Sequence, residues 1–150
     1  MDLAAEKTRL TSLLGAWGAA STATGTALAL WGRATHRPQL AAFGRQTAMW
    51  GAIDSAIAGM GVISESRRAA TDDPASIDAD RRKLQLLLKV NSAADVAYIA
   101  GGTALVAATL ATGQRRVAGM SLTTGDGIAI IVQGSFLLAL DLTFARRLSA

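Results

Sequence analysis

The chain has no cysteine and only one histidine, and both shortages exclude classes of site. Without cysteine there can be no disulfide, no thiolate zinc site and no iron–sulfur cluster. The one histidine, His36, falls in an expected loop, which excludes haem held by two axial histidines. The sequence also lacks the motifs of hydrolases, zinc proteases and phosphate-binding loops. We therefore expect a protein that is not an enzyme and carries no cofactor.

Charge is scarce over long parts of the sequence. Four stretches carry either no charge or only aspartate: 10–32, 46–64, 90–114 and 117–145. The aspartates within them are Asp54, Asp95, Asp126 and Asp141. At about 1.5 Å per residue, each stretch is long enough to cross a hydrocarbon core of roughly 30 Å. The pattern predicts an all-α integral membrane protein, with a soluble alanine-rich bundle as the alternative.

Glycine favours the membrane interpretation. Most of the 15 glycines fall inside the apolar stretches. In a helix surrounded by water, each would cost up to about 1 kcal/mol relative to alanine. Membrane helices, by contrast, use small residues to bring their backbones close together.

The four stretches extend into the helices of a single membrane domain, residues 1–150. We expect an up-down-up-down bundle of four transmembrane helices, at about 8–32, 38–66, 77–112 and 117–148. Pro38 suits the first position of a helix, and a tight turn is expected at Gly113. The third helix starts among charged residues, so we expect it to extend beyond the membrane.

Lysine and arginine set the expected orientation, because cytoplasmic segments carry an excess of both. Ten of the 15 lie near the termini, in the connection at about 67–76 or at the start of the third helix. We therefore place both termini and that connection in the cytoplasm, in a multi-pass protein of the cell membrane. Anchoring at lipid headgroups explains the basic pairs at helix ends, and no nucleic-acid partner is expected.

Polar residues inside the apolar stretches are candidates for function. An ionisable residue within a membrane helix costs roughly 2.5–3.5 kcal/mol on insertion scales. In the last three helices such residues recur every three or four positions and so share one face. Depth along the helices predicts three layers: Asp54 with Gln133, Asn91 and Asp95 with Asp141, and Arg45 with Asp126. The first helix is expected to serve packing.

These groups have a structural and a functional interpretation. In the structural one they bond the helices together, at about 0.6 kcal/mol apiece, and Arg45 forms an ion pair with Asp126. In the functional one Asp95 and Asp141 share or relay a proton, or hold a hard cation together with Asn91. Alternatively, the cavity binds a small amphipathic or cationic molecule. The aromatic walls of that cavity would be Trp17, Trp50 and Tyr98.

Three segments resemble those of small uncharacterised four-helix bacterial integral membrane proteins. They are Phe43-Gly-Arg-Gln-x3-Trp50-Gly-x2-Asp54-x2-Ile57-Ala-Gly59, Asn91-x3-Asp95-Val-x-Tyr98 and Val132-Gln-Gly-x-Phe136-Leu-Leu-x2-Asp141. The resemblance covers most of the chain and implies no known activity. Its members often carry a histidine three residues after the final aspartate, where Phe144 stands here. This chain therefore lacks the histidine that a role for an Asp/His pair would need at that position.

The expected function is that of a non-enzymatic membrane protein with a polar interior, acting as a ligand-binding, accessory or assembly component. One alternative is a small proton- or cation-coupled transporter, oligomeric because four short helices enclose little volume. Another is a subunit of a larger membrane complex. A small-residue face on the first helix, unused within the chain, would mark such a subunit: Gly15, Gly18, Ser21, Thr22 and Gly25.

Overall fold

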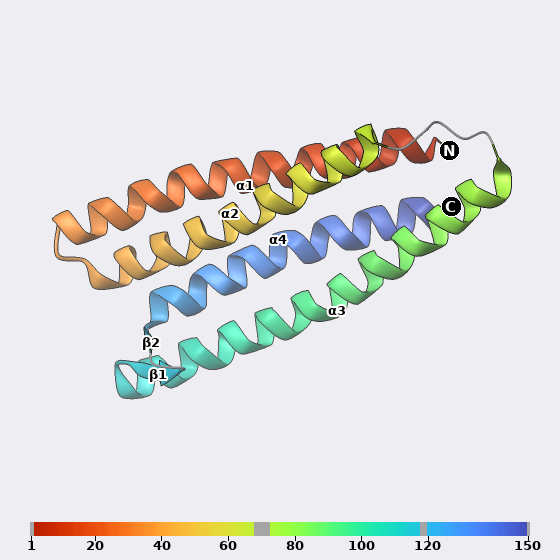
Figure 1. Ribbon diagram of the computed structural model, residues 1–150. Coiled ribbons are helices and arrows are strands. Elements are labelled where there is room, and N and C mark those ends of the chain that lie inside the picture. Colours follow the sequence, from red (N-terminus) through yellow and green to blue (C-terminus); the bar gives the residue numbers. More distant parts are fainter. Residues whose placement is uncertain (1, 68–72, 118–119, 150) are drawn as a thin grey trace.

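The computed structural model describes residues 2–67, 73–117 and 120–149. Its elements are α1 (Leu3–Ala34), α2 (Pro38–Ser66), α3 (Pro74–Thr112), β1 (Arg115–Val117), β2 (Met120–Leu122) and α4 (Thr124–Ser149) (Figure 1). The all-α architecture with four helices is confirmed. Of the expected connection at 67–76, residues 68–72 lie outside the described part.

Aspartates fix the starts of two helices. Asp2 accepts hydrogen bonds from the backbone nitrogens of Ala4 and Ala5, at 2.9 and 3.3 Å, so α1 begins earlier than expected. Asp73 accepts in the same way from Ala75 and Ser76, and α3 therefore begins at Pro74 rather than near 77. Such caps satisfy backbone donors that the first turn of a helix leaves unpaired.

The start expected for the last helix, at 117, is wrong. Two short strands pair in antiparallel fashion between α3 and α4, with Arg115 opposite Leu122, and α4 begins only at Thr124. The side chain of Asp126 accepts from the backbone nitrogen of Thr123 at 2.8 Å, which fixes this start. Apolar residues without charge suit a short strand as well as a helix, so the composition of this segment could not distinguish them.

The helices form two antiparallel pairs that lie side by side. In Figure 1, α1 runs along α2 and α3 runs along α4, and contacts between α2 and α4 join the two pairs. Both chain ends lie at the end of the bundle where α2 finishes and α3 starts. The hairpin and the turn between α1 and α2 lie at the opposite end. This is the up-down-up-down order expected from the sequence.

The contact between α1 and α2 is made by backbone against backbone. Its glycines recur every seventh residue: Gly18, Gly25 and Gly32 on α1, and Gly44 and Gly51 on α2. A Cβ atom on Gly18 would lie 2.6 Å from the backbone nitrogen of Ser55, and one on Gly51 would lie 2.6 Å from the carbonyl oxygen of Gly18. Only glycine allows this approach. The small-residue face of the first helix is therefore used within the chain.

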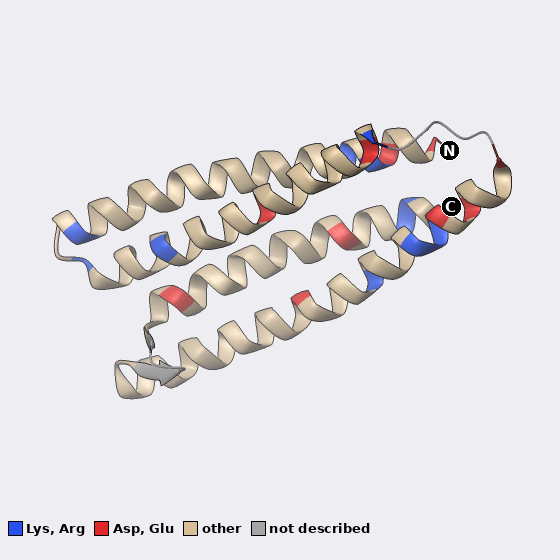
Figure 2. Ribbon diagram, viewed as in Figure 1, with Lys and Arg blue, Asp and Glu red and all other residues tan. Residues whose placement is uncertain are grey.

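Charged side chains gather at the end of the bundle that holds the termini (Figure 2). There Lys7 pairs with Asp80 at 3.2 Å and with Glu65 at 3.6 Å, and Arg147 pairs with Glu6 at 3.6 Å. These pairs tie α1 to the ends of the other helices. Because their side chains are partly exposed, each contributes little to stability.

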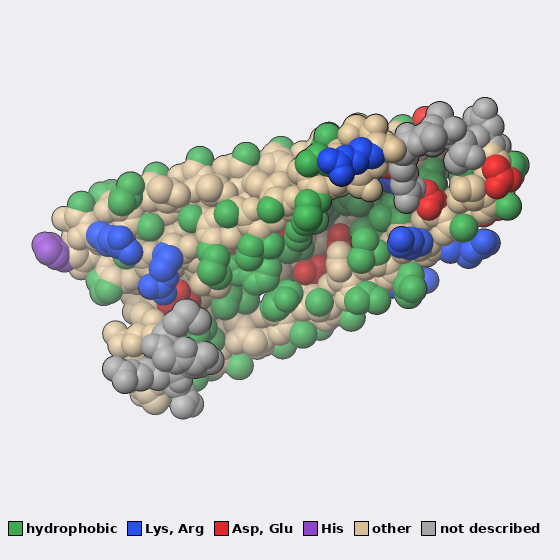
Figure 3. Space-filling view, in the orientation of Figure 1, with side chains coloured by type: hydrophobic (Ala, Val, Ile, Leu, Met, Phe, Trp, Pro, Cys, Tyr) green, Lys and Arg blue, Asp and Glu red, His purple; other side chains and the backbone are tan. Residues whose placement is uncertain are grey.

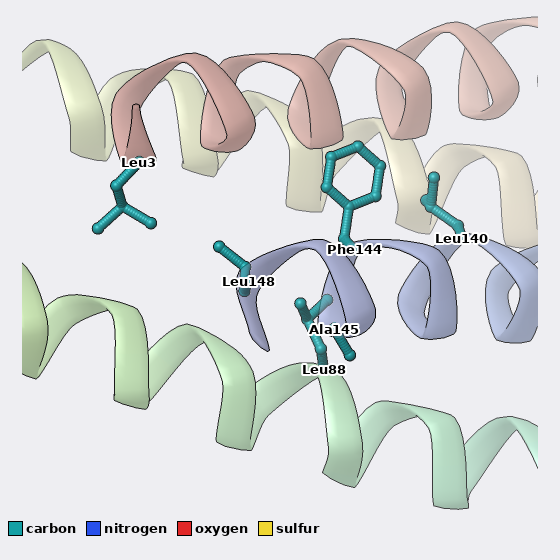
Figure 4. Packing of buried hydrophobic residues seen from close by; sticks show 6 residues of the cluster. All are labelled: Leu3, Leu88, Leu140, Phe144, Ala145 and Leu148. Carbon is teal, nitrogen blue, oxygen red and sulfur yellow. The ribbon is translucent and has the colours of Figure 1, made fainter. Parts of the chain in front are cut away.

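Beneath the charged end lies the main hydrophobic cluster. It joins α1, α3 and α4 through Leu3, Leu88, Leu140, Phe144, Ala145 and Leu148 (Figure 4). Elsewhere large apolar side chains face outward, and hydrophobic groups are spread along the face seen in Figure 3. Two helices, α3 and α4, are each long and apolar enough to cross a membrane.

Candidate functional site

Four aspartates lie within the helices and away from the charged end, on α2, α3 and α4 (Figure 2). Their exposed fractions are 2% for Asp54, 4% for Asp95, 0% for Asp126 and 7% for Asp141. A buried carboxylate needs hydrogen bonds or a cation to replace the water it has lost. The surroundings of the four differ in how fully they supply these partners.

Asp126 has partners on both carboxylate oxygens. Arg45 donates from Nη2 to one oxygen at 2.7 Å, and Thr123 donates to the other from its backbone nitrogen and its hydroxyl, at 2.8 and 3.1 Å. Nearby, the backbone nitrogen of Gly125 donates to Gln39 Oε1 at 2.8 Å. The structure thus brings Arg45 and Asp126 together, and the pair joins the starts of α2 and α4.

Gln133 does not form the layer with Asp54 that its depth predicted. Its Oε1 accepts from Trp17 Nε1 at 2.7 Å, and its Nε2 donates to Ser21 at 3.3 Å, so both ends of the amide turn to α1. The ring of Trp17 also stacks on Phe136, with centroids 3.9 Å apart. Depth gives the level of a residue but not the neighbour it faces. The first helix, expected only to pack, therefore supplies polar partners too.

The remaining three aspartates form a group that spans α2, α3 and α4. Asp95 interacts electrostatically with both Asp54 and Asp141, and the side chain of Asn91 is a polar neighbour of Asp141. One oxygen each of Asp54 and Asp95 is buried without any hydrogen-bond partner. Among the described residues, no lysine or arginine pairs with any of the three. We call Asp54, Asp95 and Asp141 the acidic group.

Aromatic side chains connect α2 and α3 beside the acidic group. Trp50 lies one helical turn before Asp54, and its ring meets that of Tyr98 edge to face, with centroids 5.1 Å apart at 70°. The indole nitrogen of Trp50 is buried and has no hydrogen-bond partner. Tyr98 is 45% exposed and so lies at the surface of the bundle. Trp17, the third aromatic residue expected at the site, instead bonds to Gln133.

Acidic side chains lie at a hollow in the surface. Contacts between α2 and α3 are few, because α2 packs on α1 and α4 while α3 packs on α4. Figure 3 shows a hollow between α2 and α3 with hydrophobic side chains around it and acidic atoms at its floor. The hollow opens on the apolar outside of the bundle, and the side chains of the acidic group beneath this surface are 7% exposed or less.

Residues 13–142 match a family of unknown function, DUF6992. The chain belongs to the DUF6992 family. This confirms the resemblance to an uncharacterised family, and the matched range includes the four buried aspartates, Arg45 and Gln133. No curated protein and no solved structure matches the chain.

In this DUF6992 chain Phe144 occupies the position where related sequences were expected to carry histidine. Its side chain is 2% exposed, lies in the hydrophobic cluster and has the guanidinium of Arg147 5.5 Å from the centre of its ring. Asp141 therefore has a hydrocarbon neighbour here where a histidine would offer a base. Across the described parts of the chain, no three acidic or histidine side chains are arranged to hold a metal ion.

Proposed function

We propose that this DUF6992 chain is a non-enzymatic integral membrane protein whose acidic group binds a small amphipathic cation. All four helices cross the bilayer in this proposal, as part of a multi-pass protein of the cell membrane. The observation that carries it is the pair of buried oxygens of Asp54 and Asp95, which have no partner. Burial and charge each support a separate part of the proposal.

The distribution of polarity supports a lipid environment. The buried polar residues include Asp54, Asp95, Asp126 and Asp141 together with Gln133, whereas large apolar residues are exposed. On α2 alone, Met60 and Val62 are 62% and 60% exposed, and Met49 is 50% exposed. Water would penalise so large an apolar exterior, whereas lipid tails accept it. Since α2 itself carries such a surface, the proposal extends the membrane to helices beyond α3 and α4.

The same arrangement supports the orientation. The termini, the end of α2 and the start of α3 share one end of the bundle, and most lysine and arginine residues belong to it. The excess of these residues on the cytoplasmic side of membranes places this end in the cytoplasm.

An organic cation suits the acidic group better than a metal ion. A hard cation such as Ca²⁺ takes six to eight oxygen ligands, and the described side chains do not converge in that way. A cation with an apolar body would instead use the carboxylates of Asp54 and Asp95 and lie against the Trp50 and Tyr98 rings. Attraction between a cation and an aromatic face contributes about 0.5–2 kcal/mol.

A proton- or cation-coupled transporter is the second candidate. It is favoured by the electrostatic repulsion of Asp95 on both Asp54 and Asp141, since carboxylates from three helices are then close enough to influence one another. A flux of protons or cations into sealed vesicles would distinguish transport from binding alone. The idea of a subunit in a larger complex loses its main feature, because Gly18 and Gly25 pack against α2.

Binding is tested with the protein in nanodiscs and labelled tetraphenylphosphonium, an amphipathic cation. The Asp54→Asn/Asp95→Asn variant should bind at least tenfold more weakly, because both uncompensated charges are gone. Asp78→Asn, at an exposed position near the start of α3, is the control and should bind normally. Tetraphenylborate, an anion of the same shape, should not bind. The proposal would be contradicted if tetraphenylborate bound as well as tetraphenylphosphonium. It would also be contradicted if the double variant bound tetraphenylphosphonium as well as the unaltered protein does.

Membrane insertion is tested separately. After alkaline extraction of membranes, the protein should remain in the pellet and require detergent for release. A folded protein in the supernatant would remove the basis of the whole proposal.

A further inference from the structure

A second site lies at the end of the bundle away from the termini. There the structure has a cavity of about 490 Å³ between the α1–α2 turn, the start of α2 and the segment before α4. Its lining includes Arg33, His36, Arg37 and Arg45, together with the hydroxyl-bearing Thr123. Among the described residues that line it, none is acidic. Both its position and its charge distinguish it from the acidic group.

The cavity has an excess of positive charge. Arg45 is balanced by Asp126 at 2.7 Å, yet half of its side chain stays exposed. In the described part of the chain, neither Arg33 nor Arg37 forms an ion pair with a carboxylate. Two cationic side chains therefore have no carboxylate counter-ion among the described residues. The guanidinium group, with its fork of donors, matches the oxygens of a phosphate.

The turn that carries these residues is fixed by its backbone. Thr35 and Arg37 donate to the carbonyl oxygens of Trp31 and Gly32, at 2.9 and 2.7 Å. At the apex His36 has φ of +53°, a conformation that favours glycine. A histidine there costs about 1 kcal/mol, so the turn alone does not explain its presence. Its imidazole lines the cavity.

We propose that this cavity binds the phosphate group of an anionic lipid. The proposal rests on the membrane location proposed above, which puts this end of the bundle at the headgroups. Trp31 supports that depth, because it is 55% exposed, lies 5.9 Å from the guanidinium of Arg37, and tryptophan is enriched at membrane interfaces. The positive charges of Arg33 and Arg37 then neutralise the negative charge of the headgroup phosphate, and Arg45 adds a third guanidinium.

The test compares lipids on the purified protein in a neutral detergent, by native mass spectrometry. Phosphatidylglycerol should bind at least tenfold more tightly than phosphatidylcholine. The Arg33→Gln/Arg37→Gln variant should lose this preference. Arg9→Gln/Arg82→Gln removes the same charge at exposed positions near the other end and should keep it. Equal retention of both lipids, or an equal loss in the control, would overturn the proposal.

Two further measurements complete the test. His36→Gly relieves the backbone at the apex, so it should fold normally and bind phosphatidylglycerol several-fold more weakly; unchanged binding would contradict the proposal. Inorganic phosphate at millimolar concentration should leave the lipid in place. Displacement by phosphate would assign the cavity to a free anion instead of a lipid. Because tetraphenylphosphonium binds at a different place, its binding should be unchanged in all these variants, which separates the two proposals.

Discussion

The two sides of α2 are built in opposite ways. Toward α1, Gly44 and Gly51 bring two backbones together with no side chain between them. Toward α3, Trp50 meets Tyr98 edge to face, and Asp54, one helical turn further on, has one oxygen buried without a hydrogen-bond partner. One side of the same helix is filled to the limit of atomic contact, and the other has space and unsatisfied polar groups.

This difference suggests separate roles for the two sides of α2: the side toward α1 stabilises the bundle, and the side toward α3 carries the proposed binding group. Lipid surrounds apolar helices as readily as another helix does, so association in a membrane depends on close packing and on polar contacts between helices. The glycine side of α2 and the Arg45–Asp126 pair supply both kinds of contact. The Asp54 side supplies neither, which leaves one oxygen of its carboxylate without a hydrogen-bond partner.

The largest effect should come from filling the glycine side. A Cβ atom on Gly44 would already lie 2.6 Å from the carbonyl oxygen of Gly25, so Gly44→Leu must separate α1 from α2. We expect the free energy of unfolding to fall by about 3 kcal/mol or more, at the upper end for overpacking. Denaturation in mixed micelles, followed by circular dichroism, measures it.

Gly59→Leu is the matched control, since a Cβ at Gly59 on the same helix has no atom within 4 Å. It should leave stability nearly unchanged. If both variants lose equal stability, the contrast between the two sides of α2 is wrong.

A smaller loss in the free energy of unfolding is expected at Asp126, where both carboxylate oxygens have hydrogen-bond partners. Asp126→Asn removes the ion pair with Arg45 and disturbs the bonds from Thr123, all within 3.1 Å. Because Arg45 is half exposed and can be rehydrated, we expect about 2 kcal/mol rather than the larger cost at a fully buried pair. A double-mutant cycle with Arg45→Gln isolates the pair. Additive losses would mean that the two side chains do not act together.

Much of this arrangement was predictable from spacing and depth. Residues 38–66 were predicted as a helix, and α2 has these bounds. The pairing of Arg45 with Asp126 followed from their equal depth on helices that run in the same direction. Periodicity specifies which residues share a face, and the rise per residue specifies their level. Together they place polar groups in layers.

The spacing of residues in the sequence does not predict which neighbouring helix a given helix face contacts. Gln133 was assigned to Asp54 by level, yet it turns to Trp17 and Ser21 on α1. The seven-residue recurrence of Gly18 and Gly25 signals a close helix pair, and it agrees with the expected packing role of the first helix rather than with the unused face that a subunit of a larger complex would show. The hollow depends on the separation of α2 and α3, which no local pattern encodes.

The smallest effect should have the opposite sign. Asp54→Asn makes the same substitution as Asp126→Asn at an equally buried position, but it removes a charge that has no cation partner and that Asp95 repels. We expect the free energy of unfolding to rise by about 1 kcal/mol, because a neutral amide costs less to bury than an unpaired charge. The same micelle denaturation measures it, with Asp95→Asn expected to act alike and the pair to be less than additive. If Asp54→Asn destabilises the protein as Asp126→Asn does, then the carboxylate bonds the helices together, and the open side of α2 serves structure after all.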